Sequence, residues 1–75
     1  MSEEKFKLLI ESIGFKYNVH RYYEYKNYQI DLFEDIYDFF DGYYWNESIP
    51  LNDLKPLEKE FKQALRSIKL KNILG

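Results

Sequence analysis

The chain has 75 residues, thirteen acidic and eleven Lys or Arg side chains, a net charge of −2 and no cysteine. This length allows a single domain over residues 1–75, and the lack of cysteine excludes a disulfide scaffold, a thiol nucleophile and a thiolate metal site. The N-terminal segment carries acids where a signal peptide carries bases, and no apolar run approaches the ~18 residues of a membrane span. We therefore expect a soluble, intracellular protein of the cytoplasm that does not bind membranes.

The first predicted element is a helix over residues 3–13. Ser2 is a good N-cap, and two acids in the first turn suit the positive end of the helix dipole. Gly14 then stands where a residue with positive φ closes a helix. Apolar residues recur at i, i+3, i+4 and i+7, at Phe6, Leu9, Ile10 and Ile13.

From Phe15 the apolar period changes to two, in residues rich in Tyr, Phe and Ile, which predicts an antiparallel meander. We expect strands near 15–25, 28–33 and 36–40, with a short fourth strand at 43–45 as an option. Turn signals stand at Lys26-Asn27, Glu34-Asp35 and Asp41-Gly42, and the last of these suits a two-residue type I′ turn.

Residues 31–40 have an alternative. Leu32, Phe33, Ile36, Phe39 and Phe40 also fit a helical stripe, although the pattern favours strands.

Residues 46–53 have the composition of a loop, and a second amphipathic helix follows. Asn52 or Asp53 can cap it, and Pro56 fits its first turn. Its apolar stripe comprises Leu57, Phe61, Ala64, Leu65 and Ile68. Beyond Ile68 the apolar residues leave this face, so either the helix bends near Ser67 or a last short turn packs separately. The predicted fold is thus α+β: helix, a meander of three or four strands, helix.

Acidic residues are concentrated in residues 27–54, which we call the acidic block: it holds seven acids and neither Lys nor Arg. Such acids can simply keep a Tyr-rich sheet soluble. They can also imitate the phosphates of a nucleic acid, and the interleaved Tyr and Trp residues suit a protein-binding hot spot. The candidate partner-binding residues are Asp31, Glu34, Asp35, Asp38, Asp41, Tyr37, Tyr43, Tyr44 and Trp45.

Basic residues line one side of the second helix. We call Lys55, Lys59, Lys62, Arg66 and Lys69 the basic stripe, since they recur at i, i+4, i+7, i+11 and i+14. Solvated helix faces commonly look like this, and bases near a helix C-terminus are favourable. The functional alternative is a helix that contacts phosphates.

No constellation in the sequence indicates catalysis. His20 is the only histidine, the serines lack a nucleophile elbow, and the three glycines form no phosphate loop. The carboxylates of the acidic block do not follow an EF-hand pattern. We expect no enzyme activity, no metal and no cofactor.

The sequence favours a small non-enzymatic protein-binding module that uses the acidic aromatic surface against the basic surface of a larger protein. Small acidic proteins of phages and mobile elements often inhibit nucleic-acid-processing or defence proteins, as anti-CRISPR proteins do, and we expect a modulator of this kind. The alternative is a weak nucleic-acid binder that uses the basic stripe. An acidic sheet and a basic helix also permit a homodimer beside a monomer.

Overall fold

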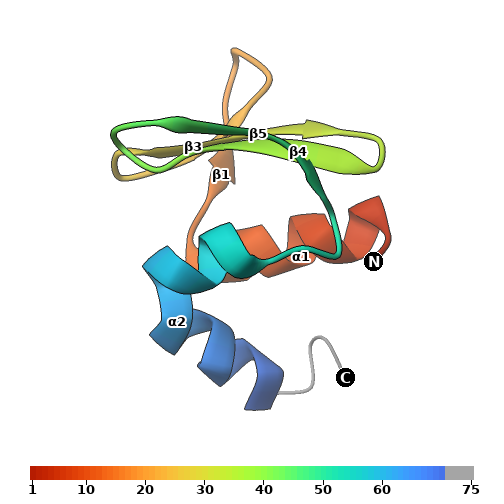
Figure 1. Ribbon diagram of the computed structural model, residues 1–75, viewed down its shortest axis with the longest axis vertical. Coiled ribbons are helices and arrows are strands. Elements are labelled where there is room, and N and C mark those ends of the chain that lie inside the picture. Colours follow the sequence, from red (N-terminus) through yellow and green to blue (C-terminus); the bar gives the residue numbers. More distant parts are fainter. Residues whose placement is uncertain (71–75) are drawn as a thin grey trace.

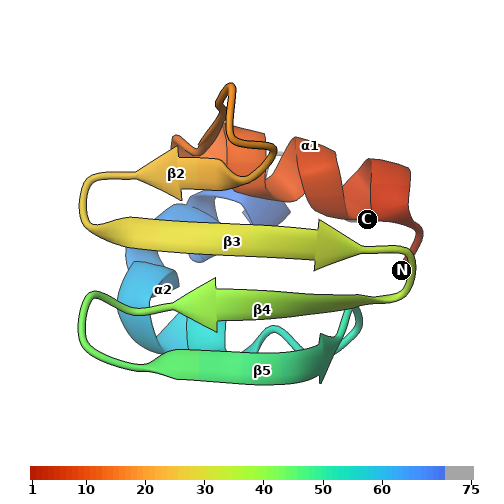
Figure 2. The same cartoon turned by 90° about the horizontal axis from the view of Figure 1, so that it is seen from above.

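The structure is a computed structural model that describes the backbone of residues 1–70 and the side chains of residues 1–68. Two helices lie on one side of a five-stranded antiparallel sheet whose strands follow the chain order β1-β2-β3-β4-β5 (Figures 1 and 2). The elements are α1 (Glu3–Ile13), β1 (Lys16–Tyr17), β2 (Tyr23–Tyr25), β3 (Tyr28–Phe33), β4 (Ile36–Phe40), β5 (Trp45–Pro50) and α2 (Lys55–Leu70). The α+β class is confirmed, with five strands in place of the three or four predicted.

Helix α1 has the predicted bounds and caps. The Ser2 hydroxyl accepts a hydrogen bond of 3.2 Å from the backbone N–H of Lys5. Gly14 has a φ of 134°, and its N–H donates to the carbonyl oxygens of Ile10 and Glu11. The four residues of the predicted stripe are the buried residues of the helix.

Strands β3 and β4 match the predicted bounds, so residues 31–40 are not a helix. The helical alternative is wrong because side chains alternate between the two sheet faces: Ile30, Tyr37 and Phe39 are buried on one face, while Asp31 and Asp38 beside them point to the other. The five apolar residues within residues 31–40 are compatible with both the helical period and the strand period.

The predicted strand over 15–25 is instead two strands joined by a loop. The Asn18 side-chain oxygen accepts hydrogen bonds from the backbone N–H groups of His20 and Tyr22, and Arg21 has a φ of 69°. An Asn side chain that bonds to backbone N–H groups ahead of it forms a turn and interrupts the strand ladder. His20 is therefore an exposed loop residue, whereas the alternation placed it in a strand.

Residues 45–50 form strand β5, so the predicted loop at 46–53 is shorter and the fourth strand at 43–45 is misplaced. Polar residues obscure this strand in the sequence, but Ile49 is buried and pairs with Tyr37 of β4. The preceding connection is also wider than a two-residue turn. It spans 41–44, with the Asp41 N–H bonded to the Tyr44 carbonyl oxygen at 3.1 Å.

Helix α2 begins as predicted, because the Asp53 carboxylate accepts a hydrogen bond of 3.1 Å from the Lys55 N–H. Its backbone is kinked at Phe61 (φ −125°, ψ 36°), not near Ser67. The Phe61 ring packs against Phe15 and Tyr28, with centroids 5.6 and 4.6 Å away. The kink coincides with this tertiary packing. The helical spacing of apolar residues in the sequence gives no sign of the kink. The last short turn considered beyond Leu70 lies outside the described residues.

Candidate functional site

The sheet has two unequal faces. Figure 1 shows both helices beneath it, while above it the loop between β1 and β2 rises, next to β2 (Figure 2). We call the uncovered side the open face. Strand alternation and register place its residues in three rows: Lys16, Glu24, Gln29, Phe40 and Trp45; then Asp31 and Asp38; then Phe33, Ile36 and Pro50.

The central row consists of two carboxylates in register. Asp31 of β3 lies directly opposite Asp38 of β4. The Asp38 carboxylate accepts a hydrogen bond of 2.8 Å from the backbone N–H of Ser48, in the β-bulge of β5, whereas Asp31 has only a 3.5 Å contact from the Gln29 side chain. No Lys or Arg among the described side chains forms an ion pair with either residue. Like charges directly opposite each other destabilise a sheet, so this pair is a liability that the chain itself does not neutralise.

Apolar side chains flank the two carboxylates on both sides. Phe40 and Trp45 face each other across β4 and β5, with ring centroids 5.3 Å apart. On the other side Phe33 lies opposite Ile36. Phe33 and Trp45 are 50% and 42% exposed, which is unusual for residues that contribute so much when buried. The open face therefore presents a charged centre with the apolar row of Phe33, Ile36 and Pro50 on one side and the apolar end of the first row, Phe40 and Trp45, on the other.

The other predicted partner-binding residues lie in the turns at the two ends of this face. Glu34 and Asp35 are exposed in the turn between β3 and β4. Tyr43 and Tyr44, 85% and 76% exposed, stand in the turn between β4 and β5. Both turns are continuous with the open face.

Asp41 and Tyr37 have structural roles instead. The Asp41 carboxylate accepts hydrogen bonds of 2.9 and 2.8 Å from the backbone N–H groups of Tyr43 and Tyr44, and these bonds lower the pKa of Asp41. Tyr37 is fully buried on the helix side of the sheet. Because Tyr37 is buried, its side chain is not available to a partner. Side chains alternate along β4, and this alternation places Tyr37 on the helix side and its neighbour Asp38 on the open face.

The basic stripe belongs to α2, on the helix side of the sheet, so the open face and this stripe are separate surfaces (Figure 1). Lys55, Lys59, Lys62 and Arg66 are exposed, and the kink at Phe61 divides them into two pairs. The side chain of Lys69 lies outside the described residues.

Within the described residues, no group of three or more His, Cys, Asp or Glu side chains is arranged to hold a metal ion. No helix among residues 1–70 combines the length and apolar character needed to cross a membrane. The His20 imidazole stacks near the Tyr22 ring, with ring centroids 6.1 Å apart. In the described part of the chain, no side chain forms a hydrogen bond or ion pair with the His20 imidazole.

Sequence reasoning missed two features of these surfaces. Ile36 and Phe40 belong to the open face, but they were not among the predicted partner-binding residues. The dipeptide Phe39-Phe40 was the available signal, since adjacent strand residues point to opposite faces and cannot both enter one core. A pocket that includes Lys7, Arg21 and Tyr23 was also missed, because it joins residues far apart in the sequence.

No protein-family model, no curated protein and no solved structure matches this chain.

Proposed function

We propose that this chain is a non-enzymatic protein-binding module that docks its open face on a basic surface of a larger protein. The observation that carries the proposal is the central row, where Asp31 and Asp38 face each other without a cation and are flanked by exposed apolar side chains. A partner that supplies Lys or Arg to this row would neutralise an unfavourable pair and bury the rings beside it.

The surrounding residues support this mode of binding. Charged centres set the sign and orientation of a partner, while aromatic anchors supply most of the affinity. Phe33 and Trp45 are available as anchors on the two sides of the carboxylates, and Tyr43 and Tyr44 extend the surface at one end. A basic surface of this kind is what nucleic-acid-processing proteins present to phosphates. Inhibition or modulation of such a protein, including one used in defence, is the role that we propose for the complex.

The test is a pull-down with tagged protein from the source cells, at low and high salt and with nuclease treatment in parallel. We expect a nucleic-acid-processing protein that is captured at low salt, survives nuclease and is released by salt, because salt screens the attraction between an acidic face and a basic surface during association. The captured protein is then purified and its affinity measured by titration calorimetry. Asp31→Asn combined with Asp38→Asn should weaken this affinity by at least about tenfold.

A matched variant separates the open face from general charge effects. Lys59→Gln with Lys62→Gln changes two charges on α2 and leaves the open face intact, so binding should be retained. If the double Asp variant binds as tightly as the unmodified chain, the open face is not the binding surface and the proposal is wrong.

Nucleic-acid binding through the basic stripe is the second candidate, favoured by four exposed cations on one helix. Binding should be strongest at ~50 mM salt, where counterion release contributes most. A gel shift with single-stranded and duplex probes at that salt, lost in the Lys59→Gln and Lys62→Gln variant, would support this candidate against the first.

A further inference from the structure

Exposed apolar side chains give the open face a tendency to associate. Phe33 and Trp45 are 50% and 42% exposed, and the half-buried Ile36 and Phe40 lie beside them on the same face. An uncovered surface of this kind is a ready contact surface. A second copy of the chain carries the same side chains, so it is the first occupant that the open face has to admit or exclude.

Two carboxylates occupy the middle of this surface. The register places Asp31 and Asp38 one row away from Phe33 and Ile36 on one side and one row away from Phe40 on the other. Neighbouring rows on one face are two residues apart along a strand, which is about 7 Å. Any surface that covers the apolar side chains on both sides must therefore also cover the two carboxylates.

Symmetry makes the central position of the acids decisive. Two sheets that pack face to face lie ~10 Å apart. When two copies pack about a two-fold axis over the centre of the open face, the central row of one copy lies over the central row of the other, whether the strands are aligned or crossed. Four carboxylates then meet, and the apolar side chains around them exclude water, so salt screens their repulsion only weakly.

No cation on the open-face side neutralises these carboxylates among the described residues. Lys16 lies opposite Glu24 at the β1 edge of the sheet. Arg21 belongs to the loop that rises beside β2, and no ion pair joins it to Asp31 or Asp38. The repulsion at the centre of a face-to-face pair would therefore remain uncompensated.

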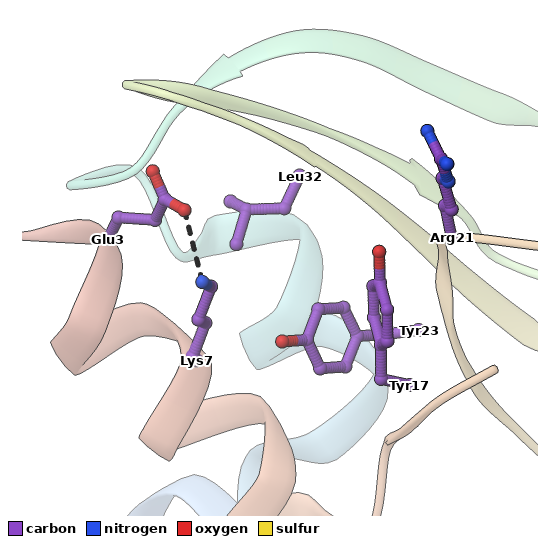
Figure 3. Close-up of a pocket in the computed structure, with 6 residues that line it drawn as sticks. All are labelled: Glu3, Lys7, Tyr17, Arg21, Tyr23 and Leu32. Atoms are coloured by element: carbon purple, nitrogen blue, oxygen red, sulfur yellow. Dashed lines mark ion pairs between the residues drawn. The ribbon is translucent and has the colours of Figure 1, made fainter. Parts of the chain in front are cut away.

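Other cations lie on the helix side of the sheet. Lys7 forms an ion pair of 3.2 Å with Glu3 at a pocket between α1 and the sheet, which Tyr17 and Tyr23 also line (Figure 3). The basic stripe belongs to α2, which lies on the same side (Figure 1). Both sets of charges would point away from a face-to-face contact, so they would not relieve the repulsion within it.

We propose that Asp31 and Asp38 keep the chain monomeric by excluding a second copy from the open face. The apolar side chains favour pairing, and the two carboxylates oppose it in every centred two-fold arrangement. Arrangements that avoid the acids are shifted off centre and bury less apolar surface. This inference does not rest on the proposed function, because self-association is measured on the purified chain without a partner.

The test replaces both acids by amides and follows the molecular mass by sedimentation equilibrium. The unmodified chain should have the mass of one chain at the highest concentration at which it stays dissolved. Asp31→Asn with Asp38→Asn should form a homodimer, with a self-association constant at least about tenfold above the limit set by the unmodified chain, because juxtaposed like charges disfavour a pair. Asparagine keeps a side-chain oxygen that can accept the hydrogen bond from the Ser48 N–H.

Trp45 reports whether the new contact uses the open face. It is the only tryptophan of the chain, and its side chain is 42% exposed. Its fluorescence emission should move to shorter wavelengths as the dimer forms, because the ring leaves water. Adding Phe33→Ser to the double Asp variant should restore the monomer, since it removes an exposed apolar side chain from the contact.

Glu4→Gln with Glu11→Gln is the matched control, because it makes the same change of net charge at exposed positions of α1. This control should remain monomeric, and circular dichroism verifies the fold of each variant. A dimeric unmodified chain, a monomeric double Asp variant, or equal dimerisation of the control would each overturn the proposal. A dimer that leaves the Trp45 emission unmoved, or that survives Phe33→Ser, would overturn it as well.

Discussion

The hydroxyl of Tyr37 donates a hydrogen bond of 2.7 Å to the backbone carbonyl oxygen of Asp53. Tyr37 lies at the centre of the sheet, and the Asp53 carboxylate accepts from the first N–H of α2. The Tyr37 ring also packs on Phe6 of α1, with centroids 4.6 Å apart. One buried side chain thus links the sheet with both helices.

Replacing Tyr37 with Phe should lower the free energy of unfolding by about 1–2 kcal/mol. The ring contacts survive, but the Asp53 carbonyl oxygen loses its partner at a partly buried position. Urea denaturation followed by circular dichroism measures the change. Tyr43→Phe, at an 85% exposed turn, is the matched control and should leave stability unaltered. Equal stability of the two variants would show that the bond to Asp53 contributes nothing.

Stability should fall as the pH rises above about 10, the ordinary pKa of tyrosine. Burial raises the pKa of Tyr37 well above that value, and the nearby carboxylates of Asp53 and Glu58 add to the shift. The folded state therefore keeps its proton where the unfolded chain has released it. This contribution is fully present below pH ~10 and decreases above it, by at most ~1.4 kcal/mol per pH unit for one proton.

The same titration in Tyr37→Phe distinguishes this group from others. Unfolding measured between pH 8 and pH 11, values chosen around the tyrosine pKa, should depend less on pH in the variant. Tyr23 and Tyr28, whose pKa values are also raised, account for the dependence that remains. An identical slope in both proteins would contradict the assignment.

Asp31→Asn should stabilise the free protein by roughly 0.5 kcal/mol, because it removes one of two like charges placed opposite each other. The gain should shrink in high salt, where the repulsion is screened. Glu34→Gln makes the same change of net charge in an exposed turn and should have little effect. Thermal unfolding at low and high salt compares the two, and a destabilised Asp31→Asn variant would refute the account of this pair.

Gly14→Ala should cost more stability than Gly42→Ala. Both glycines have positive φ, 134° and 100°, so both substitutions strain the backbone. At Gly14 an added Cβ would also stand 2.7 Å from Cε1 of Tyr25, whereas at Gly42 its nearest neighbour is the Asn27 Cβ at 3.9 Å. We expect Gly14→Ala to be worse by at least about 1 kcal/mol in urea denaturation. Equal losses would mean that the Tyr25 ring moves aside freely.

Local patterns in the sequence predicted most elements of the fold, and the exceptions have identifiable causes. The caps of α1 and the alternation in β3 and β4 involve residues close together in the sequence, so they can be recognised from the sequence. The break of the first strand depends on one side chain, Asn18, and β5 depends on pairing with β4. The kink at Phe61 coincides with ring packing that joins three elements. None of these leaves a periodic signal.

The candidate surfaces divide in the same way. Charge segregation in the sequence pointed to Asp31 and Asp38, but only the register places them opposite each other. Tyr37 was misassigned because composition marks aromatic residues without saying which side of a strand they occupy. The pocket was not predicted, because only the tertiary fold brings Lys7 and Arg21 to the wall of the same pocket.

The sequential order of the strands has a kinetic consequence. Every strand pairs with its neighbour along the chain, so each hairpin closes a short loop at small entropic expense. Among the described residues, the distant encounters are those of the helices: α1 with the sheet, as in the packing of Phe6 on Tyr37, and α2 with α1 and the helix side of the sheet. A chain built in this way should fold rapidly for an antiparallel protein. If α2 docks after the rate-limiting formation of the hairpins, substitution of Phe61 should raise the unfolding rate more than it lowers the folding rate.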